Sequence, residues 1–311
     1  MSQALLSRRA FALGALALLA SGCAGNATGQ APASQASSRT WTDDGKLHVA
    51  ATFYPMADFA AKVGGERVEV ICLVPAGTEP HDWEPSPDDV ITIQTADLVV
   101  SNGAGIDAWL DDVLASLGSE APATVCTSDG LTLLKTEHGT DPHLWLDPAN
   151  AKLQAQAIAE ALARVDAEGA HSYQDNVAAY VQALTDLDQE FQTGLAGCTR
   201  HEIVVSHEAY GYLCQAYHLE QVGIEGLSPD SEPDAARMAE IVDLVRARGV
   251  TTIFFEELVS PKVAQTIAAE TGAEAVELSP LEGLSDADLA AGEDYLSVMR
   301  DNLSKLQKAL S

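Results

Sequence analysis

Short apolar runs rich in β-branched residues alternate with longer segments of helical periodicity from Leu47 to the end of the chain. The apolar runs predict buried strands, and the segments between them predict amphipathic helices. The predicted strands are 47–53, 68–74, 98–101 and 123–127, then 202–206, 220–223, 251–256 and 275–278. The predicted helices outside the central segment are 55–63, 87–95, 106–117, 209–217, 233–248, 261–271 and 290–310.

Regular alternation of strand and helix favours parallel sheets, one in each half of the chain, with helices on both faces. Between the halves, residues 149–195 contain no proline and break only at Glu168-Gly169-Ala170. The second part of this segment is a predicted long helix whose apolar positions follow a three-four rhythm, so one face is buried. These positions are Val177, Tyr180, Val181, Leu184, Leu187, Phe191 and Leu195.

The fold class is therefore α/β, with two lobes that each hold a parallel sheet flanked by helices. One long rigid linker helix joins the lobes. The expected boundaries are 46–169 for the first lobe, 170–196 for the linker helix and 197–311 for the second lobe.

The amino terminus has the pattern of an export signal. Arg8 and Arg9 precede an uncharged apolar stretch that ends at Ser21-Gly22-Cys23. This stretch is too short for a transmembrane helix and predicts a signal peptide over residues 1–22. The pattern resembles a bacterial lipobox, so Cys23 is expected to carry lipid and residues 23–45 to form a flexible tether. Sec and twin-arginine export both fit the paired arginines.

The chain is strongly acidic. Its 311 residues carry a net charge of -29, and loss of the two signal arginines brings this to -31. Such a surface excludes nucleic acid as a partner, because phosphates need a basic footprint. It suits a protein that gathers cations, although an acidic surface that only aids solubility is the commoner explanation of such a charge.

Four cysteines remain after Cys23, and none of them form a Cys-x-x-Cys motif. A thiolate zinc site is therefore not expected. Outside the cytoplasm, disulfides are permitted, and four cysteines allow three pairings. The pairing that we expect joins Cys198, just before a predicted strand, to Cys214 in the helix after it.

Two similar motifs hold the most informative histidines. Glu79-Pro80-His81-Asp82-Trp83 and Asp141-Pro142-His143-Leu144-Trp145 both place an acid and a proline before the histidine and a tryptophan two residues after it. Proline stiffens the approach to each histidine. A nearby carboxylate can accept the second imidazole N–H, as carboxylates do around protein-bound metals.

Four side chains follow strand ends, where parallel α/β sheets bind ligands. They are His81, His143, His207 and Glu282. Three imidazoles and a carboxylate suit a tetrahedral site for Zn²⁺, with Mn²⁺ as the alternative. Taken alone, His207 can instead cap a helix, and Glu282 can lie in an ordinary exposed turn. The carboxylates expected to support the imidazoles are Asp141, Asp147, Glu208 and Glu256.

Five stretches carry a family resemblance: Glu79-Pro80-His81 with Glu84-Pro85, Asp141-Pro142-His143-Leu144-Trp145-Leu146-Asp147-Pro148, Ser206-His207-Glu208-Ala209-Tyr210-Gly211-Tyr212, Phe254-Phe255-Glu256 and Ser279-Pro280-Leu281-Glu282-Gly283-Leu284. In these, the chain resembles the metal-binding solute-binding lipoproteins of bacterial ABC transporters, and most of all the zinc-specific members. The resemblance implies one buried cation, delivery to a permease in the cytoplasmic membrane and a lipid-anchored, monomeric protein outside the cytoplasm.

Two other functions compete with zinc import. In a zinc-dependent hydrolase, the three histidines would be the ligands of a catalytic zinc. Against this, the chain lacks the His-Glu-x-x-His motif, and a fourth protein ligand closes the position that substrate needs. We therefore expect no enzyme activity. A surface adhesin is the third alternative, because similar proteins are described that way. If the histidines are ligands, metal affinity should fall as the pH drops from about 6 to 5.

Overall fold

The computed structural model describes residues 40–229 and 233–311, all within one compact unit, Ser38–Ser311. The predicted signal peptide, Cys23 and most of the tether lie outside the described residues. Among the described helices, none combines the length and apolar character needed to cross a membrane.

The first half contains a four-stranded parallel sheet in the order β2-β1-β3-β4. Ser86 caps one of its helices: its hydroxyl accepts the Asp89 N–H, as expected for a serine before a helix that begins with proline. The elements are β1 (Leu47–Ala51), α1 (Tyr54–Gly64), η1 (Gly65–Arg67), β2 (Val68–Cys72), α2 (Pro87–Gln94), β3 (Leu98–Ser101), α3 (Trp109–Leu117), η2 (Gly118–Glu120) and β4 (Ala123–Cys126).

The second half repeats this topology. Its parallel sheet has the order β10-β9-β7-β8, so counting strands from the start of each half gives the arrangement 2-1-3-4 in both. The elements are β7 (Glu202–Val205), α6 (Gly211–Tyr217), β8 (Glu220–Gly223), α7 (Ala235–Arg248), β9 (Thr252–Phe255), α8 (Lys262–Thr271), β10 (Glu274–Glu277), α9 (Asp286–Ala291) and α10 (Tyr295–Leu310). The predicted α/β class with two helix-flanked parallel sheets is confirmed.

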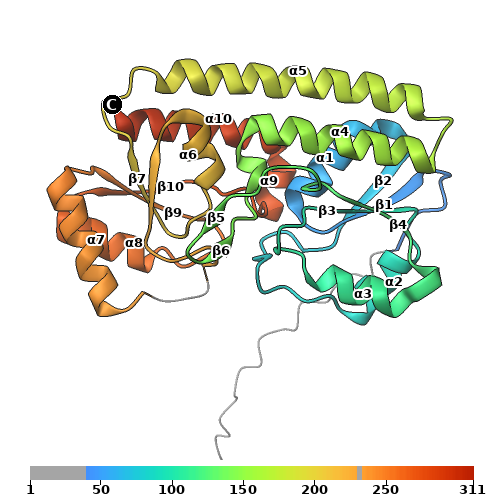
Figure 1. The fold of residues 1–311 in the computed structure, drawn as a ribbon, viewed down its shortest axis with the longest axis horizontal. Coiled ribbons are helices and arrows are strands. Elements are labelled where there is room, and N and C mark those ends of the chain that lie inside the picture. Colours follow the sequence, from blue (N-terminus) through green and yellow to red (C-terminus); the bar gives the residue numbers. More distant parts are fainter. Residues whose placement is uncertain (1–39, 230–232) are drawn as a thin grey trace, which may run out of the picture. The chain divides into compact units, whose positions relative to one another are not determined.

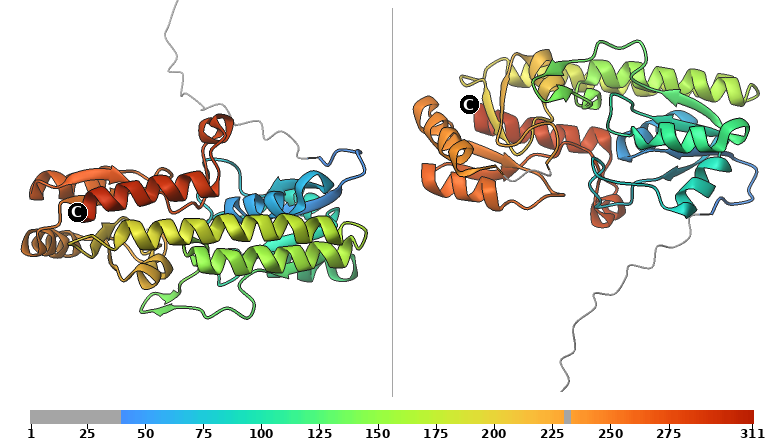
Figure 2. Two further views of the ribbon diagram at one scale, coloured as in Figure 1. Left: turned by 90° about the horizontal axis from the view of Figure 1, so that it is seen from above. Right: turned by 60° about the horizontal axis from the view of Figure 1, so that its bottom comes forward.

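Between the sheets lie η3 (Leu144–Leu146) and two long helices, α4 (Pro148–Val165) and α5 (Ala170–Leu195). Figure 1 shows α5 passing along both sheets, and Figure 2 confirms that α4 and α10 lie beside it. The buried positions of α5 follow the predicted rhythm, except that Val181 is only half-buried. The lobe boundaries themselves stay predictions.

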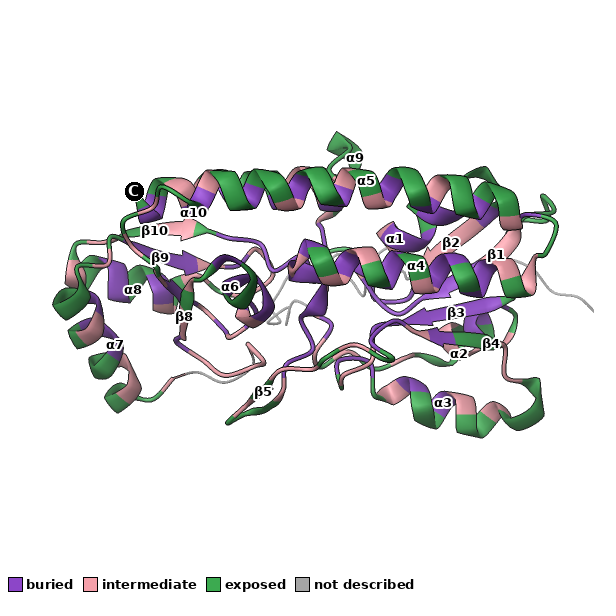
Figure 3. Ribbon diagram, turned by 45° about the horizontal axis from the view of Figure 1, so that its top comes forward, coloured by how far each residue is buried: buried purple, intermediate pink, exposed green. Residues whose placement is uncertain are grey.

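One hydrophobic core extends through both halves. It includes Val49 of β1 and Val205 of β7. Phe59 of α1 meets Tyr295 of α10 edge-on at a ring-centroid distance of 5.0 Å. In Figure 3, buried segments recur along α4 and α5 between exposed ones. Because close-packed interiors resist deformation, this shared core fixes the two sheets against each other.

One local expectation was wrong, and one pair of short strands was missed. The predicted helix 290–310 is two helices, α9 and α10, because Gly292 ends the first with φ = 84° and the Asp294 side chain caps the second. The antiparallel pair β5 (Lys135–Thr136) and β6 (Gly139–Thr140) was not predicted, because two-residue strands are too short to leave a periodic pattern.

The expected disulfide is also absent, since Cys198 and Cys214 are both free thiols. Cys214 is buried in the shared core and Cys198 packs against that core. Burial raises the pKa of both thiols, so each behaves as a small apolar side chain.

The titration of Asp58 in α1 should make the free energy of unfolding depend on pH. Its half-buried carboxylate accepts a hydrogen bond from the Tyr180 hydroxyl, and burial raises its pKa to about 6. A raised carboxyl pKa gives stability that is complete below about pH 4 and lost as the pH rises through the folded value. Between pH 5 and pH 8, metal-free native protein should therefore lose about 1–2 kcal/mol more than Asp58→Asn in urea unfolding. Parallel pH profiles for the two proteins would refute this assignment.

Candidate metal centre

Four predicted side chains meet between the two sheets. His81 follows β2, His143 follows β4, His207 follows β7 and Glu282 follows β10. Each offers one donor atom, and the four donor atoms all lie within 4.8 Å of one another. The placement at the carboxyl ends of parallel strands explains why residues so distant in sequence converge.

The Glu282 carboxylate lies at the centre of the group. Its Oε1 is 3.0 Å from His143 Nε2, 3.1 Å from His207 Nε2 and 3.2 Å from His81 Nε2. His143 Nε2 is also 3.3 Å from the Nε2 atoms of both other histidines. His143 and His207 are fully buried, whereas the His81 side chain is 10% exposed. All three Nε2 atoms therefore face one small, nearly closed space.

Two further carboxylates orient the buried imidazoles. Asp141 Oδ1 lies 2.8 Å from His143 Nδ1, and Glu256 Oε1 lies 2.8 Å from His207 Nδ1. Each imidazole can donate its Nδ1–H outward, which leaves the Nε2 lone pair free to face the centre. This arrangement prepares Nε2 to bind a cation.

The two sequence motifs make the same hydrogen bond between an acidic side chain and the histidine backbone. The His143 N–H donates to Asp141 Oδ1 at 2.9 Å, and the His81 N–H donates to Glu79 Oε1 at 3.1 Å. The acid two residues before each histidine therefore closes a turn across the intervening proline. Glu79 was not predicted as part of the site, but its place in the repeated motif, equivalent to that of Asp141, was the signal available.

The pKa values follow from burial and neighbouring charge. Burial works against the charged imidazole of His207, but the Glu256 and Glu282 carboxylates outweigh it and hold its pKa well above the usual range. Burial would raise the pKa of Glu282, yet His207 and His81 hold it well below its usual range. Burial and then the Glu282 charge raise the pKa of Glu79 to about 9.

The centre also has surplus acceptor atoms. One oxygen of each surrounding carboxylate is buried with no hydrogen-bond partner among the described residues; these are Glu79 Oε2, Asp141 Oδ2, Glu256 Oε2 and Glu282 Oε2. Unpaired buried acceptors are costly unless a positive charge compensates them. The donor set therefore fits a divalent cation.

Asp147 and Glu208, the other two carboxylates predicted to support the imidazoles, make different contacts. Asp147 caps α4, because its Oδ1 accepts the Ala149 N–H at 2.8 Å. Glu208 is only half-buried and packs against Gly223, while its backbone N–H binds the Gly226 carbonyl. Sequence position suggested both, but their side chains do not support the imidazoles.

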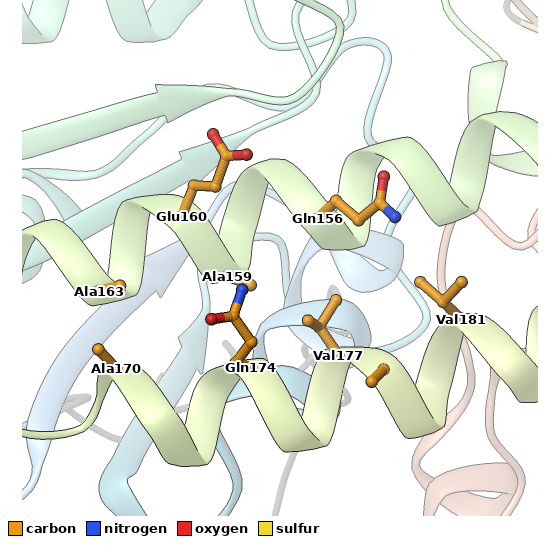
Figure 4. Close-up of a pocket in the computed structure, with 9 residues that line it drawn as sticks. Gln156, Ala159, Glu160, Ala163, Ala170, Gln174, Val177 and Val181 are labelled. Carbon is orange, nitrogen blue, oxygen red and sulfur yellow. The ribbon is translucent and has the colours of Figure 1, made fainter.

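A groove lined by α4 and α5 lies away from these residues. The groove has a volume of about 700 Å³, and Figure 4 shows residues of α4 and α5 that line it, among them Ala159, Glu160 and Val177. It brings together no set of titratable groups, so the buried centre is the stronger candidate.

Residues 49–309 match the sequence profile of the ZnuA family, described as the periplasmic component A of a zinc-uptake complex. The chain belongs to the ZnuA family. The resemblance predicted from the five sequence stretches is thereby confirmed.

Named members of the ZnuA family are similar over most of this chain. The high-affinity zinc uptake system protein ZnuA of Bacillus subtilis is 36% identical over 280 residues, which are 85% of this chain and 88% of that protein. The zinc-binding lipoprotein AdcA of Streptococcus pneumoniae is also 36% identical, but this chain spans only 56% of its length. The Zn(II)-bound ZnuA-like domain of that AdcA has a TM-score of 0.78 at 37% identity, covering 86% of this chain and 99% of the domain.

Removal of the carboxylate behind His207 should change its titration. In the metal-free protein, Glu256→Gln should lower the His207 pKa, because a neutral amide no longer stabilises the imidazolium. The stability that the raised His207 pKa contributes is complete below about pH 6.5 and is lost as the pH rises through the pKa of His207 in the folded protein. Glu256→Gln should therefore weaken this pH dependence of the free energy of unfolding. NMR titration of the His207 ring checks this, with Glu208→Gln as the control. An unchanged His207 titration in Glu256→Gln would contradict the assignment.

Proposed function

We propose that this protein binds Zn²⁺ outside the cytoplasm and delivers it to the permease of an ABC transporter. The observation that carries the proposal is the buried group of three imidazoles and one carboxylate, whose donor atoms already face one another. His81, His143, His207 and Glu282 are the proposed ligands, with Asp141 and Glu256 orienting two of the imidazoles.

The spacing of the donor atoms supports a small tetrahedral ion. Zinc bonds of about 2.0–2.2 Å place neighbouring donors about 3.3–3.6 Å apart in a tetrahedron. Five donor pairs here are 3.0–3.3 Å apart, so a slight expansion accommodates the ion. Three imidazoles favour zinc over manganese, because Mn²⁺ prefers more oxygen ligands and higher coordination.

Four protein ligands also argue for transport rather than catalysis. A catalytic zinc keeps one position open for water or substrate, whereas Glu282 fills the fourth position here. The family is named for zinc uptake, which supports a binding protein without enzyme activity. The manganese, hydrolase and adhesin alternatives remain predictions with less support.

The membrane attachment is part of the same proposal. Lipid on Cys23 would hold a monomeric protein at the outer face of the cytoplasmic membrane, within reach of the permease. One similar protein, AdcA of Streptococcus pneumoniae, is named a lipoprotein, which supports this assignment.

Metal preference and the loss of one proposed ligand together test the zinc site. Purified protein starting at Ala24 should prefer Zn²⁺ over Mn²⁺ strongly, and His207→Ala should weaken Zn²⁺ binding by at least about 100-fold because a buried ligand is lost. Competition titration with a chromogenic chelator measures both. His171→Ala is the control, since the His171 side chain is 90% exposed on α5. Manganese preference, or indifference to His207→Ala, would overturn the proposal.

As the pH is lowered, zinc affinity should begin to fall at a higher pH than the value of about 6 expected from the sequence. The pKa of His143 and that of His207 are both raised in the metal-free protein, despite burial, by Asp141, Glu256 and Glu282. Zinc must displace those protons, so affinity should begin to fall while the pH is still above about 6.5 and continue to fall below it. Chelator competition between pH 5 and pH 8.5 tests this. A constant affinity down to pH 5 would show that the imidazoles are not ligands.

A further inference from the structure

Trp145 lies at the boundary between the two halves of the metal centre. Its buried indole N–H donates to the Pro280 carbonyl at 2.8 Å, and its own carbonyl accepts the Tyr295 hydroxyl at 2.5 Å. The indole ring also lies 5.2 Å from the His143 ring, measured between centroids. A residue from the first half thus contacts the loop that carries Glu282 in the second.

The Glu282 turn depends on several such contacts. Leu281 is fully buried with φ = 58°, a left-handed conformation that is unfavourable for a bulky residue. Its N–H donates to Ser279 Oγ at 3.1 Å. On the other side of Glu282, the Gly77 N–H donates to the Leu284 carbonyl at 3.0 Å. Hydrogen bonds from the first half therefore flank Glu282, and the one before it comes from Trp145.

We propose that Trp145 is a positioning residue for metal binding, acting through the Pro280 carbonyl to hold the Glu282 carboxylate against the three imidazoles. The proposal rests on the proposed zinc-binding function. Without the indole N–H, the buried Pro280 carbonyl loses its donor, which is costly enough to shift the turn. Glu282 would then leave the fourth position, and water would replace it.

Trp83 provides a matched control from the earlier copy of the motif. It stands two residues after His81, as Trp145 does after His143, but its ring packs edge-on against Trp109 at 5.0 Å. Trp83→Phe and Trp145→Phe therefore make the same chemical change at equivalent motif positions. Only the second removes the donor to the Glu282 loop.

The first measurement combines zinc affinity with the visible absorption of bound Co²⁺. Trp145→Phe should weaken Zn²⁺ binding about 10–100-fold, as loss of groups that orient metal ligands commonly does. Its Co²⁺ spectrum should change in band position and intensity, because water replaces the Glu282 carboxylate among the ligands. Trp83→Phe should keep the native spectrum and affinity. A native Co²⁺ spectrum in Trp145→Phe would overturn the proposal.

A double-mutant cycle separates positioning from a merely structural role. If Trp145 acts through Glu282, Trp145→Phe should change zinc affinity less than about twofold in a Glu282→Ala background. An equal loss with and without Glu282 would overturn the proposal. Failure of the native protein to bind zinc would instead refute the proposed function, so the two failures are distinguishable.

The native indole provides a test that does not depend on a variant folding. NMR should show the Trp145 indole proton protected from solvent exchange, with and without zinc, and more strongly than that of the half-buried Trp83. Exchange as fast as that of Trp83 would contradict the hydrogen bond to Pro280 and with it the proposal.

Discussion

A buried carboxylate can remain charged inside a protein only if nearby groups compensate it. Glu282 meets this condition through three imidazole nitrogens within 3.2 Å of one of its oxygens. The imidazoles are in turn supported by Asp141 and Glu256. Removing any one of these groups would leave an unbalanced charge in the interior, so the site is stable only as a set. A divalent cation at the proposed site would complete the balance, because the four donor atoms already face one another.

The two halves of the fold repeat one topology, and each contributes side chains to this site. Both sheets have the strand order 2-1-3-4, and in each the functional side chains follow strand ends. A single shared core then holds the sheets together. Hydrogen bonds such as that from Tyr212 Oη to the Asp141 carbonyl, at 2.9 Å, tie the loops of one half to the other. Large motion between the sheets would break this core, so release of an ion from the proposed site would need local movement of the loops that carry the four side chains.

The sequence by itself determined most of the element types and indicated the four proposed ligands. Strand and helix periods differ, so they are readable without tertiary information. The ligands were predictable because parallel sheets place strand ends at one edge. The repeated acid-Pro-His pattern further indicated how the turns at His81 and His143 form. Asp141 was recognisable by the same local logic, because its contact spans only two residues.

Only the tertiary structure decided what each side chain contacts across long sequence separations. Glu256 supports His207, whereas Glu208, which is adjacent to His207, does not. Trp145 and Trp83 occupy equivalent motif positions, yet only Trp145 contacts the Glu282 loop. Cys198 and Cys214 pack in the core instead of forming a bridge. Local patterns specify backbone conformation, but partners distant in sequence depend on how the two sheets and α5 pack together, and no local pattern records that packing.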